Sequence, residues 1–379
     1  MGFSYNGWER DYQQNKRAYD KVIKESLLAG EQDTPTPFLE EEVKKISGRK
    51  YAVSTANATD GLMFALQAYG IGPGDEVLVP DFSWVASASC AAMVGATPVF
   101  CDICKHTYGI TLGSVKRMVT PKTKAIVYAH LFGGMWPEAL EVLEWCKEND
   151  IIFIEDAAHA IGVDLDGVKA GSLGHASVYS FNDNKTISGI SGGGVLMTDD
   201  EQIAKAVEKM CYHGRGHDFS EKDIVYLGRN SKMHLINAKI ITMRLKKIKQ
   251  YQKRRQEIAK IYDDFFSSLE GNYYFQSVPE NMNHNYHKYV VRFDNRKIRD
   301  KIKSVCGASV HYDPPISQNT YFKNIEHRRD EYFNYTASQG AADEIISLPI
   351  HAWMTDEEVE EVCDVMEQAI WEAENSDLN

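Results

Sequence analysis

The chain has 379 residues, and 42 Lys and Arg against 54 Asp and Glu give it a formal net charge of −12 at pH 7. With 43% hydrophobic and 25% charged residues, its composition is that of a globular protein and excludes the disordered, collagen-like and small disulfide-rich classes. The length is enough for two or three domains with a large buried core. The acidic balance argues against a nucleic-acid partner, because such partners need clustered positive charge.

Cysteine usage and the apolar segments indicate a reduced, soluble protein. The seven cysteines are an odd number spread along the chain, which predicts free thiols in the cytoplasm rather than a disulfide framework. Cys101 and Cys104 form a C-x-x-C pair, either two incidental thiols or a redox pair, but no second pair or nearby His completes a metal site. Residues 82–101 carry no charge, yet their Ser, Gly and Pro favour a buried helix and a buried strand over a membrane span. We therefore expect no metal and no membrane partner.

From about residue 51 to residue 200, short apolar runs alternate with amphipathic helical stretches. Uninterrupted apolar strands that alternate with helices are typical of an α/β fold, in which helices cover both faces of a mostly parallel sheet. In such sheets, ligands bind beyond the carboxyl ends of the strands. The expected helices span 59–69, 86–94 and 137–148, and the expected strands span 76–80, 97–102, 125–130, 151–155, 177–181 and 194–199.

The pattern changes near residue 237. Residues 237–269 lack Pro and Gly, keep a helical pattern and carry seven Lys or Arg between Arg244 and Arg255. The acidic total favours a long solvated helix that joins two domains over an anion-binding surface. A smaller α+β unit follows, with an expected half-exposed strand over 286–293, a helix, a strand over 309–312 and a last acidic helix over 355–374.

Two segments carry candidate chemistry. An apolar strand runs into Asp156, which places this carboxylate at a strand's carboxyl end, where burial requires a cationic or hydrogen-bonding partner. Lys185 lies 29 positions later, past the next expected strand and close to the glycines 192–194, and a lysine so placed is a candidate Schiff-base nucleophile. Alone, Asp156 fits a metal ligand, a catalytic acid or a turn residue, and a single lysine such as Lys185 is far more often a surface residue. Their pairing favours a functional role for both.

Pyridoxal phosphate requires such a pair. It needs a lysine for covalent attachment and an acid that keeps the pyridine nitrogen protonated, so that the ring acts as an electron sink. It also needs an aromatic plate and backbone donors at a helix N-terminus for its phosphate. Trp84 is a candidate plate, and Ala58 and Thr59 open a helix suited to the phosphate. His159 is placed to bond the ring hydroxyl, although core packing alone explains a single His or Trp equally well.

Ten segments follow one another in the order of the motifs of one enzyme family. They are ANATDGL (56–62), GIGPGDEVLVPDFSWVASA (70–88), GATPVFCDI (95–103), EDAAHAIG (155–162), YSFNDNK (179–185), GGGVLMTDD (192–200), HG (213–214), GRNSKM (228–233), VHYDPP (310–315) and LPIHAWMTDEEVEEV (348–362). Each segment alone is weak evidence for a family, whereas all ten in this order are specific evidence. On these segments the chain resembles the DegT/DnrJ/EryC1/StrS aminotransferases, the sugar-aminotransferase branch of the fold-type-I pyridoxal phosphate enzymes.

The resemblance implies a three-layer, fold-type-I large domain with a mostly parallel central sheet, and a smaller C-terminal α+β domain. It divides the chain into an N-terminal helical arm (1–30), a large cofactor-binding domain (31–250) and a small C-terminal domain (251–379). The implied assembly is a homodimer with shared active sites.

The resemblance also implies a role for each site residue. Lys185 would hold pyridoxal 5'-phosphate covalently and then shuttle the proton, and Asp156 would pair with the pyridinium nitrogen. The other cofactor-binding residues would be Ala58, Thr59 and Ser180 at the phosphate, Trp84 against the ring, His159 at the ring oxygen, and Asn230 from the neighbouring subunit. His311 and Tyr312 would line the substrate entrance.

Family members with His at the lysine position are dehydratases, so Lys185 indicates transamination. We expect an aminotransferase that moves an amino group from L-glutamate to the keto group of a nucleotide-linked deoxy sugar, as in polysaccharide biosynthesis. Ser191 stands where the family has a glutamate, and Lys232 stands for its Arg, which leaves open a small phosphorylated or other non-nucleotide ketone as the acceptor. A non-catalytic cofactor- or sugar-binding protein is a third interpretation. A nicotinamide dehydrogenase is excluded, because no G-x-G-x-x-G lies between the first strand and helix.

Overall fold

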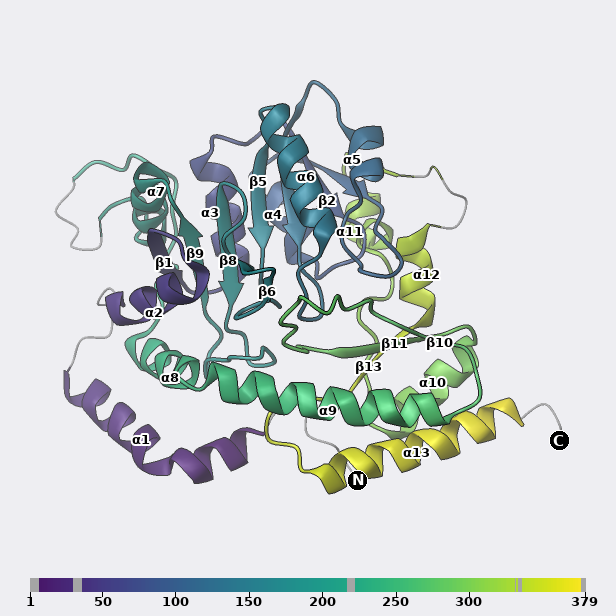
Figure 1. The fold of residues 1–379 in the computed structure, drawn as a ribbon. Helices are drawn as coiled ribbons and strands as arrows, with labels where there is room; N and C mark the ends of the chain where they lie inside the picture. The colour runs from purple at the N-terminus through teal and green to yellow at the C-terminus, as the bar shows by residue number, and fades with distance from the viewer. Residues whose placement is uncertain (1–6, 30–35, 217–221, 331, 333–335, 376–379) are drawn as a thin grey trace.

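The computed structural model describes residues 7–29, 36–216, 222–330, 332 and 336–375. Its centre is an eight-stranded sheet with the order β1-β9-β8-β5-β4-β2-β3-β12 (Figure 1). The strands are β1 (Tyr51–Thr55), β2 (Glu76–Pro80), β3 (Thr97–Cys101), β4 (Thr123–Ala129), β5 (Ile152–Asp156), β8 (Ala176–Ser180), β9 (Gly194–Thr198) and β12 (Arg328–Arg329). All neighbours pair in parallel except β9, which is antiparallel to β1 and to β8. The predicted α/β fold with a mostly parallel sheet is confirmed.

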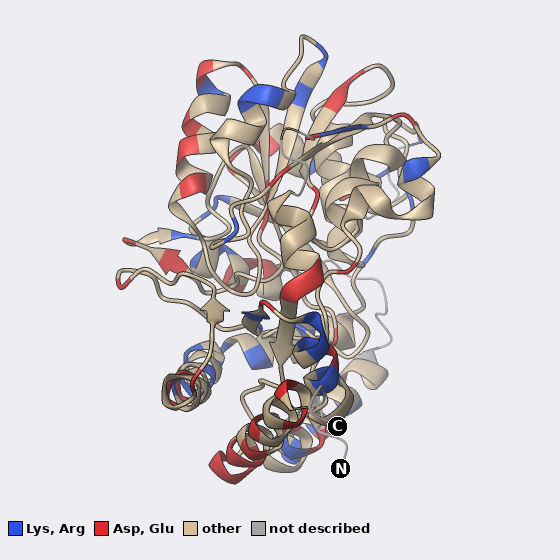
Figure 2. Cartoon of the chain, turned by 90° about the vertical axis from the view of Figure 1, so that its right-hand side faces the viewer, with Lys and Arg blue, Asp and Glu red and all other residues tan. Residues whose placement is uncertain are grey.

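The sheet has two buried faces. In β2, Leu78 packs into one core while Val77 and Val79 pack into another, because successive residues of a strand point to opposite faces. One face is covered by α2 (Pro37–Ser47), α5 (Leu112–Met118), α6 (Pro137–Glu148) and α8 (Leu235–Leu245), and the other by α3 (Ala58–Ala68), α4 (Ala86–Met93) and α7 (Glu201–Cys211). Charged residues lie mostly on the helices and loops around the sheet (Figure 2).

The C-terminal part forms a smaller α+β unit. Its antiparallel sheet has the order β10-β11-β13, and its separate core includes side chains of three helices. The elements are β10 (Tyr273–Phe275), β11 (Tyr289–Phe293), β13 (Ile345–Leu348), α9 (Ile248–Ser268), α10 (Arg296–Val305) and α13 (Asp356–Glu374). The remaining short elements are β6 (Asp164–Leu165), β7 (Val168–Lys169), α11 (Thr320–Lys323), α12 (Ala337–Glu344) and a 3-10 turn (Ile316–Gln318). No helix in the described ranges combines the length and the apolar character needed to cross a membrane.

Two expectations for this unit are wrong. The strand expected to be half-exposed is buried, because Val291 of β11 packs in the small core while Val290, on the opposite face, packs with Phe82 and Phe132 of the large unit. The strand expected over 309–312 makes only an isolated bridge, between Ser309 and Ser347, in the described chain.

The long helix expected over 237–269 is two helices. α8 ends at Leu245 and α9 begins at Ile248, because α8 packs against the large sheet whereas most of α9 packs on the small core. Arg244 and Arg255 of the basic run are buried, so the prediction of a solvated run is wrong for these two residues. The predicted domain limits at residues 30 and 250 stay a prediction.

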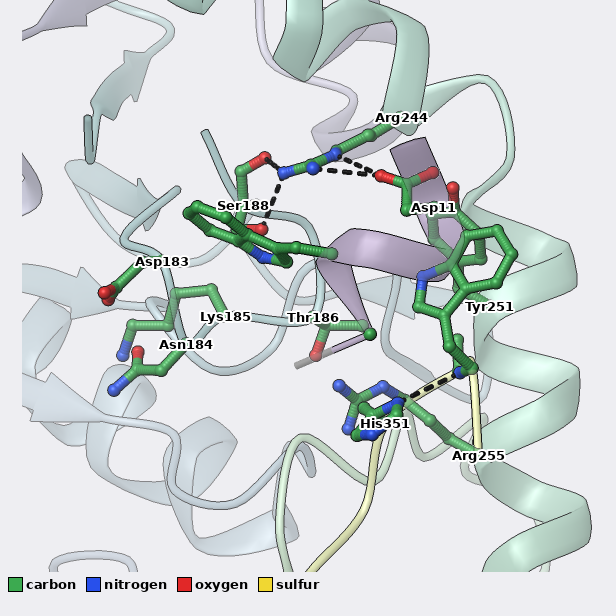
Figure 3. Close-up of a pocket in the computed structure, with 14 residues that line it drawn as sticks. Asp11, Asp183, Asn184, Lys185, Thr186, Ser188, Arg244, Tyr251, Arg255 and His351 are labelled. Carbon is green, nitrogen blue, oxygen red and sulfur yellow. Dashed lines mark hydrogen bonds and ion pairs between the residues drawn. The ribbon is translucent and has the colours of Figure 1, made fainter. Parts of the chain in front are cut away.

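A buried ion pair holds α1 (Trp8–Ala29) to α8 (Figure 3). Arg244 Nε and Nη2 lie 3.0 Å and 2.9 Å from Asp11 Oδ2, and the Tyr19 hydroxyl donates to the same carboxylate. Arg244 Nη1 also donates to the carbonyl and the hydroxyl of Ser188, at 2.6 Å and 2.9 Å. Because Ser188 lies three residues after Lys185, α1 and α8 together brace the loop that carries the candidate nucleophile.

Replacing Arg244 by Met should lower the free energy of unfolding by about 3–5 kcal/mol, because it leaves the Asp11 carboxylate buried without its cation. The matched control is Arg10→Met, one residue before Asp11 on α1, because the exposed ion pair of Arg10 with Glu358 should contribute only about 0–1 kcal/mol. Urea unfolding followed by circular dichroism measures both. Equal losses in the two variants would contradict the assigned role of the buried pair.

Candidate active site

The carboxyl ends of β5 and β8 lie side by side, because the two strands pair in parallel. Asp156 is the last residue of β5 and is 7% exposed. Its Oδ2 accepts a 2.9 Å hydrogen bond from the Ser87 hydroxyl, and its Oδ1 accepts a 3.2 Å bond from the Ala158 N–H. Burial raises the pKa of Asp156, while these hydrogen bonds and the charge of Lys185 oppose the rise. A cation bound beside Asp156 would therefore hold the carboxyl group in its ionised form.

Lys185 lies in the loop between β8 and β9. The Phe181 N–H donates a 2.9 Å bond to the Gly193 carbonyl at the base of the loop, and Asn237 Nδ2 of α8 donates a 2.7 Å bond to the Gly192 carbonyl. Burial lowers the pKa of Lys185 to about 8. Near neutral pH, the neutral and hence nucleophilic fraction of the Lys185 amine is therefore far larger than that of an ordinary lysine.

The first turn of α3 faces the same cavity. The Asn57 side chain caps the helix by accepting a 2.8 Å bond from the Asp60 N–H. The N–H groups of Ala58 and Thr59 have no carbonyl partner within the helix, since the first turn provides none. A Cβ at Gly194 would lie 2.5 Å from the Ala58 nitrogen, so this close approach requires a glycine. A helix N-terminus of this kind binds an anion such as a phosphate group.

His159 is a neutral donor at the wall of the cavity. Its Nδ1 accepts a 3.2 Å bond from the Phe132 N–H, so the ring proton lies on Nε2. Burial lowers the pKa of His159 far below its usual value. The ring centroid of His287 lies 4.2 Å away, and burial lowers the pKa of this second imidazole in the same way.

Three residues with aromatic rings stand where the cavity adjoins a wider hollow. Trp84 is 58% exposed, and its ring centroid lies 6.2 Å from that of Tyr312. His311 Nδ1 lies 2.9 Å from the Ser347 hydroxyl. Trp84, His311 and Tyr312 line both the cavity and the hollow of about 1040 Å³ beside it. A ligand that consists of two joined groups could therefore place one group in the cavity and the other in the hollow.

The structure brings nine of the ten predicted site residues into one cavity of about 190 Å³. They are Ala58, Thr59, Trp84, Asp156, His159, Ser180, Lys185, His311 and Tyr312. The tenth, Asn230, does not line this cavity but makes a β-bridge with Tyr212. The roles that the resemblance implies for these residues stay predictions.

Several residues that line or support the cavity escaped the sequence analysis. His287 and Lys288 reach the cavity from the chain just before β11, and Ser87 supports Asp156 from α4. The available signal was a pair of basic residues directly before the apolar run 289–293. Two basic residues in this position do not indicate whether their side chains face the active-site cavity or the solvent.

The cavity fits pyridoxal phosphate, the cofactor that the resemblance implies. Its wall combines an amine of lowered pKa, a buried carboxylate with donors on both oxygens, and a neutral imidazole donor. The N-terminus of α3, whose Ala58 and Thr59 line the cavity, completes the set. Lys185 and Asp156 would hold the aldehyde carbon and the ring nitrogen, and the start of α3 would hold the phosphate.

Comparisons with known proteins agree with this chemistry. The sequence model of the DegT/DnrJ/EryC1/StrS aminotransferase family matches residues 13–367. The chain is 30% identical over 328 residues to the UDP-2-acetamido-2-deoxy-3-oxo-D-glucuronate aminotransferase of Pseudomonas aeruginosa, covering 86% of this chain and 88% of that protein. It is 30% identical over 351 residues to the spore coat polysaccharide biosynthesis protein SpsC of Bacillus subtilis, covering 87% and 88%. Spr1654 of Streptococcus pneumoniae, solved in its PLP form, is 25% identical with a TM-score of 0.85, covering 94% of this chain and 97% of that one.

The lowered pKa of Lys185 predicts the pH dependence of cofactor attachment to the apoprotein. Because only the neutral amine attacks an aldehyde, the attachment rate should rise about tenfold per pH unit and level off near pH 8. For an ordinary lysine the rate would keep rising up to pH ~10.4. At pH 7.5 about a quarter of the Lys185 amines would be neutral, against about one in a thousand for an ordinary lysine.

Borohydride reduction after timed mixing with pyridoxal phosphate, followed by mass spectrometry of the Lys185 peptide, measures this rate. A rate that still increases between pH 9 and pH 10 would show that burial does not activate this amine.

Proposed function

This chain belongs to the DegT/DnrJ/EryC1/StrS aminotransferase family, and from that premise we propose that it transfers an amino group from L-glutamate to a nucleotide-linked keto sugar. Its cofactor is pyridoxal 5'-phosphate. The observation that carries the proposal is the pairing of Asp156 and Lys185 in one cavity, at the carboxyl ends of two adjacent parallel strands. A protein that only bound the cofactor would need neither a reactive amine nor a buried acid.

The cofactor, when bound, supplies an electron sink that stabilises negative charge on the substrate carbon. Asp156 holds the proton on the ring nitrogen, because its buried carboxylate is stable beside a cation. In the first half-reaction Lys185 Nζ would take the proton from the donor's carbon and deliver it to the cofactor carbon, and in the second it would move a proton the opposite way to the acceptor's carbon. This task suits an amine with a pKa of about 8. His159 would donate its Nε2–H to the ring oxygen, and Trp84 would cover one ring face.

The wider hollow supports a nucleotide-linked acceptor. Its volume of about 1040 Å³ is at the upper end of the range for small-molecule sites, and it shares Trp84, His311 and Tyr312 with the cavity as lining residues. In such an arrangement the keto carbon enters the cavity while the nucleotide stays in the hollow. The Pseudomonas aeruginosa relative, which is named for a UDP-linked 3-oxo sugar, supports the same class of acceptor.

We further propose a cytoplasmic homodimer in which Asn230 completes the partner's site. Ile224, Val225 and Leu227, in the segment just before Asn230, are each more than half exposed, and burial against a second copy would remove this apolar surface from water. All seven cysteines are free thiols, which supports a reducing compartment.

The proposal predicts that the holoenzyme converts glutamate to 2-oxoglutarate, with a change in cofactor absorbance. Lys185→Ala should lower turnover at least about 10³-fold because both the attachment point and the proton carrier are lost. Asp156→Asn should lower it about 10²-fold or more, since a neutral amide cannot hold the ring proton.

Lys205→Ala, at an exposed position of α7, is the matched control and should leave turnover unchanged. A wild-type holoenzyme that yields no 2-oxoglutarate and no spectral change would refute the transaminase assignment, and a fully active Lys185→Ala variant would refute the role of the amine.

The shared site predicts complementation between two inactive variants. Asn230→Asp, which would place a negative charge beside the phosphate, and Lys185→Ala should each be inactive alone. After subunit exchange at equal amounts, about a quarter of wild-type activity should return, because half of the dimers are mixed and each mixed dimer contains one intact site. Size-exclusion chromatography confirms the dimer. No recovery in exchanged dimers would place Asn230 in its own subunit's site, and an active Asn230→Asp variant would place it outside any site.

A further inference from the structure

The active-site cavity contains a second lysine, Lys288, for which the mechanism above has no task. It comes from the small unit, immediately before β11, and its backbone N–H donates a 3.1 Å bond to the Phe132 carbonyl of the large unit. It lines the cavity together with Lys185 and Asp156. Lys288 therefore borders the space that the reacting part of a substrate would occupy.

Buried hydrogen bonds fix the chain on which Lys288 stands. Asn285 Nδ2 donates to the carbonyls of His159 and Ile161, both at 3.0 Å, and Asn285 Oδ1 accepts a 2.8 Å bond from the His287 N–H. Arg255 Nη1 donates a 3.3 Å bond to the His287 carbonyl. The backbone next to Lys288 is thus tied to the strand-end loop that follows Asp156.

The Lys and His side chains that line the cavity around Lys288 outnumber its carboxylates among the described residues. Burial lowers the pKa of Lys288 to about 8, and its charge in turn helps to lower the pKa values of the neighbouring basic groups. These groups are Lys185, His159, His287 and His311. Among the described residues that line the cavity, Asp156 is the one carboxylate, and its oxygens already accept bonds from Ser87 and Ala158.

Lys288 also borders a second hollow of about 410 Å³, which is lined by Asp263 and Glu280. Asp263 accepts a 2.7 Å hydrogen bond from the Tyr289 hydroxyl there. The groups whose pKa values respond to the charge of Lys288 lie on the side of the active-site cavity, so its influence extends to that side.

We propose that Lys288 is a specificity-determining residue that binds a carboxylate group of the substrate inside the active-site cavity. The cofactor phosphate has its own place at the start of α3, and the nucleotide phosphates of an acceptor belong in the wider hollow, which Lys288 does not line. A carboxylate is the remaining anion that either reactant brings close to the reacting carbon. This inference rests on the proposed transaminase function.

Two substrates can supply that carboxylate, namely the amino donor and an acidic keto acceptor such as a uronate. The test uses the holoenzyme with Lys288→Met, which keeps the stem and removes the charge, and Lys288→Arg, which keeps a cation. Lys297→Met, at an exposed position of α10, is the control. Each half-reaction is followed separately, and calorimetry measures the binding of glutarate, a dicarboxylate that cannot react.

Lys288→Met should raise the half-saturating glutamate concentration and the dissociation constant of glutarate about tenfold or more, with the rate at saturation within about threefold of wild type. Lys288→Arg should restore most of the affinity. If the variant loses as much affinity for glutamine and alanine as for glutamate, the bound group is the α-carboxylate. If it loses affinity for glutamate alone, the bound group is the side-chain carboxylate. The acceptor supplies the carboxylate if the half-saturating donor concentrations and the glutarate dissociation constant are unchanged and only a uronate acceptor binds more weakly. The C6-alcohol analogue of that acceptor, which lacks the carboxylate, should then bind as it does to the wild type.

Unchanged half-saturating concentrations for every substrate, together with unchanged glutarate binding, would overturn the proposal. So would a fall in the rate at saturation with no change in affinity, since that result would assign Lys288 to proton transfer instead. Failure of the proposed function is seen separately, as a wild-type holoenzyme that performs no half-reaction, and glutarate binding then still tests Lys288.

Discussion

The site depends on the parallel pairing of β5 with β8. This pairing brings two carboxyl ends to the same edge of the sheet, so that Asp156, at the end of one strand, and Lys185, in the loop after the other, line one cavity. A carboxylate buried at such an edge needs donors, and Ser87 supplies one from α4. The edge of the sheet therefore places together the acid and the amine that are proposed to hold the cofactor ring.

The second constraint is that one strand belongs to two cores. Val290 of β11 packs with Phe82 and Phe132 of the large unit, whereas Val291 packs in the small core. The chain just before this strand is consequently held against the large unit by packing as well as by hydrogen bonds. For this reason His287 and Lys288, which are remote in sequence from Asp156, have defined positions beside it.

Local and overall charge differ in this protein. The chain as a whole carries a net charge of −12, yet among the described residues that line the cavity Lys and His outnumber carboxylates. Burial is the common cause of the low pKa values of Lys185, Lys288 and His159, because the charged form of each loses its hydration there. Net charge thus describes the long-range field of the molecule, while the chemistry of the site follows from which groups the fold removes from water.

The sequence by itself determined the α/β class, the positions of the main strands and nine of the residues that line the cavity, because apolar runs and motif order are local properties. It could not determine that Arg244 and Arg255 are buried, that residues 237–269 form two helices, or that Lys288 faces the site. A charged side chain has the same local pattern whether it faces water or an ion pair such as that with Asp11. Only the tertiary structure decides, since burial and charge compensation depend on segments that are distant in the chain.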